Sequence, residues 1–326
     1  MGGSIWPPLP VGSVALIPLR SPQDTQRPTA IALGSFDGLH QGHRRVIAAV
    51  TGAAARAAGL VPSVVSFWPH PREVLHGDTR LRLDLPAEKL ELLEPVGIEQ
   101  LVLVPFDLAL AALTPEAFVE QVLVGQLAAG IVAVGENFRF GKGRSGDTAA
   151  LIALGQRHGL AVEVLPMLWD GPERVSSSRI RRALAAGDLQ EARRLLERPY
   201  RFSGTVVRGR GLGRKLGWPT ANLQVDGRKF LPLEGVYAAM ASVAGAPPVP
   251  AVMNLGPQPT VDPMAPSAVE VHLLDRSMEL VGQELRIEPL KLLRIQCAFA
   301  NVEALSAQIG ADAEAARQVC GAYAAG

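Results

Sequence analysis

The sequence predicts an α/β unit built on a parallel sheet, followed by a smaller antiparallel β unit with a helical tail. Short β-branched runs alternate with helix-length segments up to about residue 167, which is typical of a parallel sheet covered on both faces. Beyond residue 200 the apolar runs are separated by Gly/Pro turns, the pattern of an antiparallel barrel or sandwich. A length of 326 residues suits about two domains. Because Arg198-Pro199-Tyr200 has the character of a linker, we expect domains at 1–198 and 199–326.

The first half is expected to hold five strands and four helices. The strands are predicted at 29–33, 61–67, 100–106, 131–135 and 160–167. The helices are predicted at 44–58, 86–95, 115–127 and 148–158, with Thr114 and Asp147 at the start of the last two. In a sheet of this kind, ligands bind at the carboxyl ends of the strands.

The second half is expected to hold five strands after two short helices. The helices are predicted at 179–186 and 189–197, before the linker. The strands are predicted at 202–207, 236–243, 249–255, 268–274 and 284–290. The tail is predicted to be helical, with Asn301 as N-cap of one segment and a second segment at 312–323.

A glycine-rich turn between the first strand and the first helix carries two histidines. Three glycines there permit positive φ and close approach of a ligand to the backbone. They are Gly34, Gly38 and Gly42. His40 and His43 can lie on one side of the first helical turn, where free N–H groups attract an anion. Imidazole can donate a proton or a hydrogen bond to a phosphoryl oxygen. A phosphate site and a surface or capping role both fit, whereas zinc is disfavoured because HxxH lacks the Glu of HExxH.

Polar loops follow the second and fourth predicted strands. In the first, a proline-flanked His70 is expected to shape a rigid turn rather than do chemistry. The second, 135–143, is rich in Gly, Asn, Arg and Lys and contains Asn137. It is not a P-loop, because five residues rather than four separate Gly135 from Gly141. A nucleotide contact and a solvated turn both remain open for this loop.

A serine- and arginine-rich segment follows the fifth predicted strand. Its serines, Ser176 to Ser178, are suited to capping the predicted helix at 179–186. Arginines in a first helical turn, such as Arg179, are electrostatically unfavourable unless something negative lies there. The segment therefore favours a second anion site.

Two stretches of the second half could carry chemistry. Glycines 209, 211 and 213 suit a loop whose N–H groups cover phosphates, and Thr220 and Asn222 offer neutral oxygens suited to Mg²⁺–phosphate. A glycine-rich hairpin with Pro-Thr starting the next strand is the alternative. Glu270 alternates with apolar residues in a predicted strand, so it either faces solvent or acts as a general base at a barrel mouth.

Composition and charge narrow the function classes. The chain is 48% hydrophobic and 19% charged, and its formal net charge of +1 gives no electrostatic case for nucleic acid or an anionic membrane as partner. The two cysteines form no metal or redox motif. The uncharged run at 121–135 is too short to span a bilayer, and the N-terminus lacks the basic region of a signal peptide. We expect a cytoplasmic protein; the sequence leaves its oligomeric state open.

Several motifs in order resemble one family. GSFDGLHQGH, FWPHP, GENFRFGKGRSGD and RVSSSRIR, spread over about 31–200, are similar to the FAD synthetase half of the prokaryotic bifunctional riboflavin kinase/FAD synthetase. GRGLGRKLGWPTANL, LPLEGVYAA, AVMNLGPQPT and AVEVHLLD resemble its riboflavin kinase half. The resemblance implies a Rossmann-like nucleotidyltransferase domain and a β-barrel of about six strands with a helix against it.

The resemblance also implies two ATP- and Mg²⁺-dependent reactions. The barrel would phosphorylate riboflavin to FMN, and the first domain would transfer AMP to FMN, giving FAD and pyrophosphate. Glu270 would deprotonate the ribityl hydroxyl, Thr220 and Asn222 would bind Mg²⁺, and His40 and His43 would stabilise the α-phosphate and the leaving pyrophosphate. The remaining implied ATP or phosphate contacts are Gly34, Phe36, Asp37, Gly38, Asn137, Arg174, Ser177, Ser178, Arg181, Gly209, Gly211, Gly213 and Gly217.

The chain departs from the family pattern at four positions. Ser178 replaces a usual Thr and keeps the hydroxyl, while Gln258, Val261 and Gln296 put kinase efficiency or flavin affinity in doubt. Two other classes stay open: a nucleotidyltransferase acting on a different phosphate monoester, and a flavin-binding module without turnover.

Overall fold

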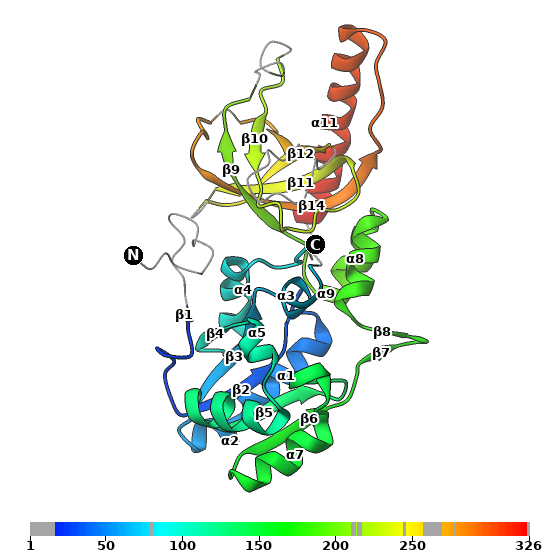
Figure 1. The fold of residues 1–326 in the computed structure, drawn as a ribbon. Coiled ribbons are helices and arrows are strands. Elements are labelled where there is room, and N and C mark those ends of the chain that lie inside the picture. Colours follow the sequence, from blue (N-terminus) through cyan, green and yellow to red (C-terminus); the bar gives the residue numbers. More distant parts are fainter. Residues whose placement is uncertain are drawn as a thin grey trace. The chain divides into compact units, whose positions relative to one another are not determined.

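The computed structural model describes residues 17–77, 81–209, 213, 217–243, 246–256, 269–276 and 278–324. They pack as two compact units (Figure 1). The sheet unit holds the described residues of 14–80 and 84–176, and the barrel unit holds those of 81–83 and 177–326. Residues 177–198, which the sequence places before the linker, thus pack with the barrel. The functional boundary near residue 198 stays a prediction.

The sheet unit is built on six parallel strands in the order β1-β4-β3-β2-β5-β6. Their bounds are β1 Leu19–Arg20, β2 Thr29–Leu33, β3 Val61–Trp68, β4 Gln100–Pro105, β5 Ala129–Gly135 and β6 Ala161–Leu165. The five predicted strands are confirmed, and the short edge strand β1 is an addition. The order reverses between β2 and β5, which is where ligands bind in open sheets of this kind.

The predicted helices of the sheet unit form, but three are subdivided. The segment predicted at 44–58 is α1 (Gln41–Thr51) and α2 (Ala53–Ala57), separated at Gly52, which has extended backbone angles. The segment predicted at 115–127 is α6 (Pro115–Ala117) followed by a π-helix, η2 (Phe118–Gln126). The other two are α4 (Pro86–Leu93) with the 3₁₀ turn η1 (Glu94–Val96), and α7 (Thr148–Arg157).

Side-chain caps explain where several helices begin. Thr114 Oγ1 accepts from the Ala117 N–H, and Asp147 Oδ1 accepts from the Ala150 N–H, as expected from their positions. The structure adds α3 (Pro71–His76), α5 (Leu108–Ala111), η3 (Lys142–Arg144) and a hairpin of β7 (Trp169–Asp170) and β8 (Glu173–Arg174). His70 caps α3, because its Nδ1 accepts from the Arg72 N–H at 3.1 Å. This cap agrees with the shaping role expected for His70.

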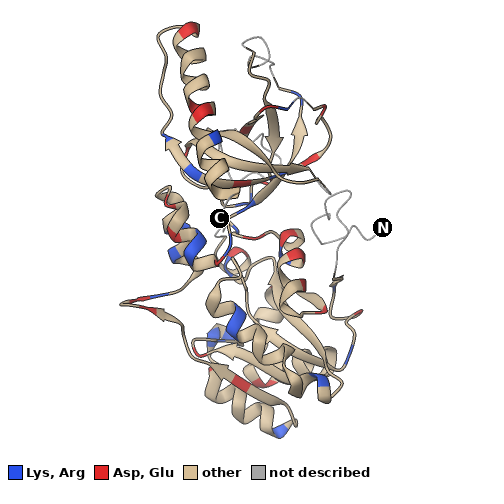
Figure 2. Cartoon of the chain, turned by 180° about the vertical axis from the view of Figure 1, so that it is seen from behind, with Lys and Arg blue, Asp and Glu red and all other residues tan. Residues whose placement is uncertain are grey.

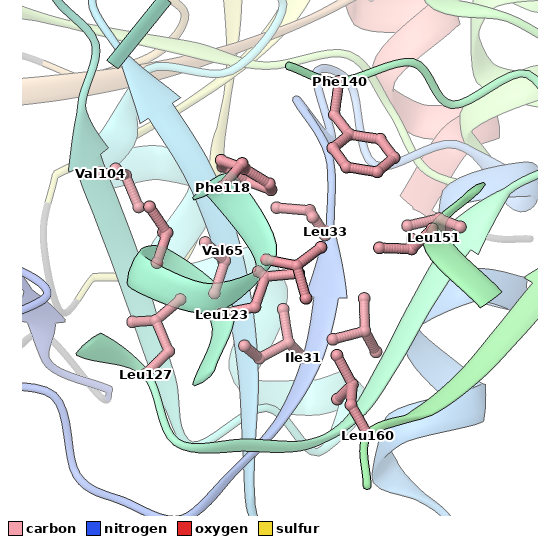
Figure 3. Close-up of a cluster of buried hydrophobic side chains, with 14 of the residues drawn as sticks. Ile31, Leu33, Val65, Val104, Phe118, Leu123, Leu127, Phe140, Leu151 and Leu160 are labelled. Carbon is pink, nitrogen blue, oxygen red and sulfur yellow. The ribbon is translucent and has the colours of Figure 1, made fainter. Parts of the chain in front are cut away.

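An apolar cluster lies on one side of the parallel sheet (Figure 3). Side chains of β2, β3 and β4, such as Ile31, Val65 and Val104, meet Phe118 and Leu123 of the π-helix. All of these side chains are 4% exposed or less. Burial of side chains of this size, worth about 1.5–3 kcal/mol each, fixes the strands whose ends carry the polar loops.

The barrel unit begins with two helices and closes six antiparallel strands in the order β10-β13-β12-β11-β14-β9. The helices are α8 (Ser177–Ala185) and α9 (Leu189–Leu196). The strands are β9 Phe202–Val207, β10 Ala221–Gln224, β11 Gly235–Val243, β12 Val249–Leu255, β13 Val269–Leu273 and β14 Glu284–Arg294. A barrel, rather than a sandwich, is thus confirmed. Strand β10 was considered only as an alternative for the Pro-Thr segment, and β14 runs four residues beyond its predicted end.

The tail is one helix, α11 (Val302–Ala324), rather than the two predicted segments. Asn301 begins it as expected, since its Oδ1 accepts from the Ala304 N–H. Ala313, Ala316 and Cys320 pack with apolar residues on the outside of β11 and β12. This apolar contact runs through the middle of the tail, so the helix continues past Gly310.

Charge and hydropathy of the folded chain agree with its composition. Figure 2 shows acidic and basic residues in both units. Within the described ranges, no helix combines the length and apolar character that a membrane crossing needs.

Candidate functional site

The histidine turn, which we define as residues 34–43, joins β2 to α1 in a conformation that costs backbone strain. Phe36 and Leu39 are non-glycine residues with φ of 45° and 42°, and Gly38 has φ of 90°. Both apolar side chains are buried, at 2% and 3% exposure. Strained backbone of this kind persists only when its surroundings hold it, and it is concentrated at functional sites.

The two histidines lie against each other at the start of α1. Their rings stack with centroids 3.6 Å apart, and Phe36 meets the His43 ring edge-on at 5.3 Å. His40 is the N-cap, and its Nδ1 accepts from the His43 N–H at 3.4 Å. The Nδ1 of His43 is buried and has no hydrogen-bond partner within the described part of the chain. The capping role and a ligand-binding role are therefore compatible.

The surroundings keep both imidazoles neutral near pH 7. Burial, together with the charges of Arg174 and Arg44, lowers the pKa of His40 from 6.5 to about 4, and Asp84 acts in the opposite direction. Burial first, then His40 and Lys89, hold the pKa of His43 well below 6.5. A neutral imidazole still has one N–H to donate. A polyphosphate beside them would raise both pKa values, because an opposite charge favours the protonated form.

Asn137 and the histidine turn follow the two strands that flank the reversal of strand order. β2 leads to the turn, β5 leads to Asn137, and these strands are direct neighbours. The carboxyl ends of neighbouring parallel strands lie at one edge of the sheet. Asn137 is exposed there, in a turn closed by the Phe138 N–H and the Gly135 carbonyl at 2.9 Å.

The remaining predicted contacts of the first site divide between the two units. Arg174, on β8, belongs to the sheet unit and acts electrostatically on His40. Ser177, Ser178 and Arg181 lie in the first turns of α8 in the barrel unit. The Arg181 guanidinium donates to the Leu81 carbonyl there, at 3.1 and 3.3 Å. Phosphate binding by this group stays a prediction.

Asp37 has an intramolecular role that its place in the motif did not reveal. It is 6% exposed, and its Oδ1 accepts from the backbone N–H of Asp84 at 3.2 Å. The Oδ2 of Asp84 accepts in turn from the Gly38 N–H at 2.9 Å. Sequence reasoning missed Asp84, because its 47-residue separation from the turn leaves no local signal.

In the barrel unit, two glycines give space to the predicted metal-binding side chains. A Cβ on Gly209 would lie 2.0 Å from Asn222 Nδ2. A Cβ on Gly213 would lie 2.3 Å from the Trp218 carbonyl oxygen and 3.2 Å from Thr220 Oγ1. The distance from Gly209 to Asn222 and the distance from Gly213 to the Trp218 carbonyl oxygen are both shorter than a real Cβ allows. The close approach of Asn222 to residue 209, and of the Trp218 carbonyl to residue 213, therefore requires glycine at both positions. At Gly217 there is space for a side chain, and glycine is favoured instead by its φ of 82°.

These polar side chains line a pocket of about 630 Å³. The lining includes Gly209, Thr220 and Asn222, together with Arg208 and Arg276. Two guanidinium groups and two neutral side-chain oxygens form a donor set that suits a polyphosphate with a hard cation. The residues present therefore fit Mg²⁺–phosphate. Gly211 lies outside the described residues.

Glu270 lies in a row of polar residues on the outer face of the barrel. It is exposed, while its neighbours Val269 and Val271 are buried inside. It pairs in register with Asn222 of β10 on one side and Asn254 of β12 on the other. Directly opposite residues project from the same face of a sheet. The register therefore places the carboxylate beside the predicted metal-binding amide, and away from the barrel interior.

Gln296 and His272 support neighbouring parts of this row. Gln296 Nε2 donates to Asn254 Oδ1 at 3.1 Å and to the Leu255 carbonyl at 3.0 Å. An ionised acidic residue, which the sequence resemblance leads one to expect at this position, could not donate either bond. His272 Nδ1 lies 2.7 Å from the Pro219 carbonyl, just before Thr220. The departures at 258 and 261 fall outside the described residues.

Comparison with known proteins agrees with two functional parts in this order. Residues 22–179 match the family model described as FAD synthetase, and residues 196–320 match the model described as riboflavin kinase. A bifunctional riboflavin kinase/FMN adenylyltransferase of Escherichia coli (strain K12) is 37% identical over 300 residues, covering 92% of this chain and 95% of that protein. The protein of the same description from Pseudomonas fluorescens is 38% identical, covering 87% and 91%.

A solved structure has the same fold. The crystal structure of a protein described as a macrolide-efflux protein from Streptococcus pneumoniae aligns with a TM-score of 0.80 and 29% identity, covering 92% of this chain and 98% of that one. Both family models, matched in order along one chain, and relatives above 30% identity over most of its length lead to one conclusion. The chain belongs to the bifunctional riboflavin kinase/FMN adenylyltransferase family.

Proposed function

We propose that this protein carries out two successive reactions of flavin cofactor synthesis. In the first, the 5′-hydroxyl of riboflavin takes the γ-phosphoryl group of ATP, giving FMN and ADP. In the second, a phosphate oxygen of FMN attacks the α-phosphorus of another ATP, giving FAD and releasing pyrophosphate. The observation that carries the proposal is that the two family models match the chain in this order, with the histidine turn in the sheet unit and the pocket lined by Thr220 and Asn222 in the barrel unit.

In the barrel unit, the chain's own residues position ATP and accept a proton. Gly209, which makes room for Asn222, lines the pocket with Thr220, and Arg208 and Arg276 would supply positive charge. Thr220 and Asn222 would hold Mg²⁺, which supplies charge neutralisation to the phosphates when bound. Glu270 would take the proton of the riboflavin hydroxyl as that oxygen forms its bond to phosphorus.

In the sheet unit, catalysis consists of positioning and charge stabilisation. The neutral rings of His40 and His43 would donate hydrogen bonds to the α-phosphate and to the leaving pyrophosphate, whose negative charge increases as the bond breaks. Asn137, at the neighbouring strand end, would hold nucleotide or phosphate. Arg174 would add positive charge near His40. Phosphate binding by Ser177, Ser178 and Arg181, which pack with the barrel unit, stays a prediction from the sequence.

Product analysis tests the function directly. The purified protein, incubated with riboflavin, ATP and Mg²⁺, should form FMN first and FAD later, as followed by chromatography of the flavins. A protein that binds flavin without consuming ATP would be a binding module. If FMN is neither made nor adenylylated while another phosphate monoester is, the protein is a different nucleotidyltransferase.

Gly209→Ala should weaken the use of ATP in riboflavin phosphorylation. The added Cβ would overlap Asn222 Nδ2 and displace that side chain from the pocket. We expect the KM for ATP to rise about 10-fold, which corresponds to ~1.4 kcal/mol of lost binding, with FMN adenylylation unchanged. Steady-state kinetics with riboflavin or FMN as acceptor measures both.

Gly321→Ala is the matched control for that variant. It adds the same methyl group to α11, where no atom lies within 4 Å of the new Cβ. Both activities should be retained in it. An unchanged KM for ATP in Gly209→Ala would contradict the assignment of Asn222 to the ATP site.

A further inference from the structure

Residues 84–89, which include the first residues of α4 and the two before it, are joined to the histidine turn by three hydrogen bonds. Asp84 Oδ2 accepts from the Gly38 N–H at 2.9 Å, and the Asp84 N–H donates to Asp37 Oδ1 at 3.2 Å. Lys89 Nζ donates to the Ser35 carbonyl at 2.7 Å. These contacts hold the turn at three residues, Ser35, Asp37 and Gly38.

The charged groups of this contact are buried. Asp37, Asp84 and Lys89 are 6%, 4% and 7% exposed. Burying a charge costs several kcal/mol unless hydrogen bonds and opposite charges compensate it. The hydrogen bonds to the turn offset part of that cost, and removal of either side chain would leave buried polar groups of the turn without these partners.

Capping of α4 does not account for the contact. The helix begins after Leu85, and the Glu88 carboxylate already accepts from the Leu85 N–H at 2.9 Å. The bonds from Asp84 and Lys89 run instead to a segment about 50 residues away in sequence. That segment is the strained one, with φ of 45° at Phe36 and 42° at Leu39.

The same two residues also act on the histidines at the end of the turn. Asp84 raises the pKa of His40, opposing burial, and Lys89 lowers the pKa of His43. Each histidine thus has one residue of segment 84–89 among the charges around it. The backbone position of the histidine turn and the charges around the two imidazole rings thus both depend on Asp84 and Lys89.

We propose that Asp84 and Lys89 are positioning residues for adenylyl transfer, holding the histidine turn in the conformation that receives the triphosphate of ATP. The proposal rests on the proposed function of the sheet unit. Misplacement of reacting groups by about 1 Å can cost about 100-fold in rate. Without the contact, the turn is expected to relax toward ordinary backbone angles, and the imidazole N–H groups would move away from the phosphates.

The test is steady-state kinetics of FMN adenylylation on the full chain carrying Lys89→Met or Asp84→Ala. We expect the KM for ATP to rise and kcat/KM to fall about 100-fold, while riboflavin phosphorylation is unchanged. Lys89→Arg keeps a hydrogen-bond donor and Asp84→Asn keeps an acceptor, so both should retain part of the kcat/KM that the first two variants lose. Arg157→Met, which removes an exposed cation from α7 of the same unit, should have no effect.

Each outcome bears on a different claim. A lower apparent kcat with an unchanged KM for ATP would mean that less of the protein is folded, which indicates a purely structural role and overturns the inference. Unchanged kinetics would also overturn it. If Lys89→Met or Asp84→Ala does not fold, Lys89→Arg and Asp84→Asn decide, since positioning predicts a raised KM for ATP in them too. If the wild-type protein makes no FAD from FMN, the proposed function itself fails.

Discussion

Replacing His43 with alanine should lower the conversion of FMN to FAD by at least about 100-fold, the usual range for removing a proton- or hydrogen-bond-donating group. The variant loses a ring that stacks on His40 and whose Nδ1 is buried next to the turn. Riboflavin phosphorylation, which uses the barrel unit, should be unchanged. Both rates can be measured on one preparation by supplying riboflavin or FMN with ATP and separating the products.

Unchanged riboflavin phosphorylation shows that the barrel unit of the variant is intact, and the unfolding temperature reports on the chain as a whole. His158→Ala serves as the matched control, because His158 is an exposed histidine at the end of α7 in the same unit. It should convert FMN at the wild-type rate. Equal loss of both activities in His43→Ala, with a normal unfolding temperature, would refute two separate sites.

Replacing Glu270 with alanine should have the opposite pattern. Removing the proton acceptor should reduce riboflavin phosphorylation by about 100-fold or more, while FMN supplied from outside is still converted to FAD. Glu270→Gln, which keeps the size of the side chain but not its basicity, should lose as much. The decisive measurement is FMN formed from riboflavin and ATP, alongside FAD formed from FMN and ATP.

Glu288→Gln provides a control on the same barrel. This carboxylate lies on β14 and pairs in register with Met240, whereas Glu270 lies between two asparagines. It should phosphorylate riboflavin normally. Unchanged FMN production in both Glu270 variants would rule out the general-base assignment.

Much of the fold could be predicted from the local sequence, because the hydrophobic period of a strand or a helix is visible within a few neighbouring residues. The strands at 29–33, 202–207 and 249–255 have the predicted bounds. Errors arose where tertiary packing overrides local preference. The tail continues through Gly310 as a single helix because its apolar residues pack on the barrel. Strand β10 is only four residues long and carries a weak pattern of its own.

The candidate sites divide in the same way. The motif residues His40, His43, Asn137, Thr220 and Asn222 could be named from residue type and spacing. Their arrangement could not. The neighbouring positions of β2 and β5 are a property of strand order, and the pairing of Glu270 with Asn222 is a property of barrel register. Both are set by contacts between segments far apart in the chain.

By itself, the sequence determined the class of each unit, their order and the residue types that can bind phosphate and move a proton. Only the tertiary structure decided that Glu270 faces outward, that Gly209 makes room for Asn222, and that Asp84 and Lys89 hold the histidine turn. The physical reason is that backbone preference and hydrophobic period act over a few residues. Burial of a charge and close approach of two segments instead depend on what the rest of the chain places beside them.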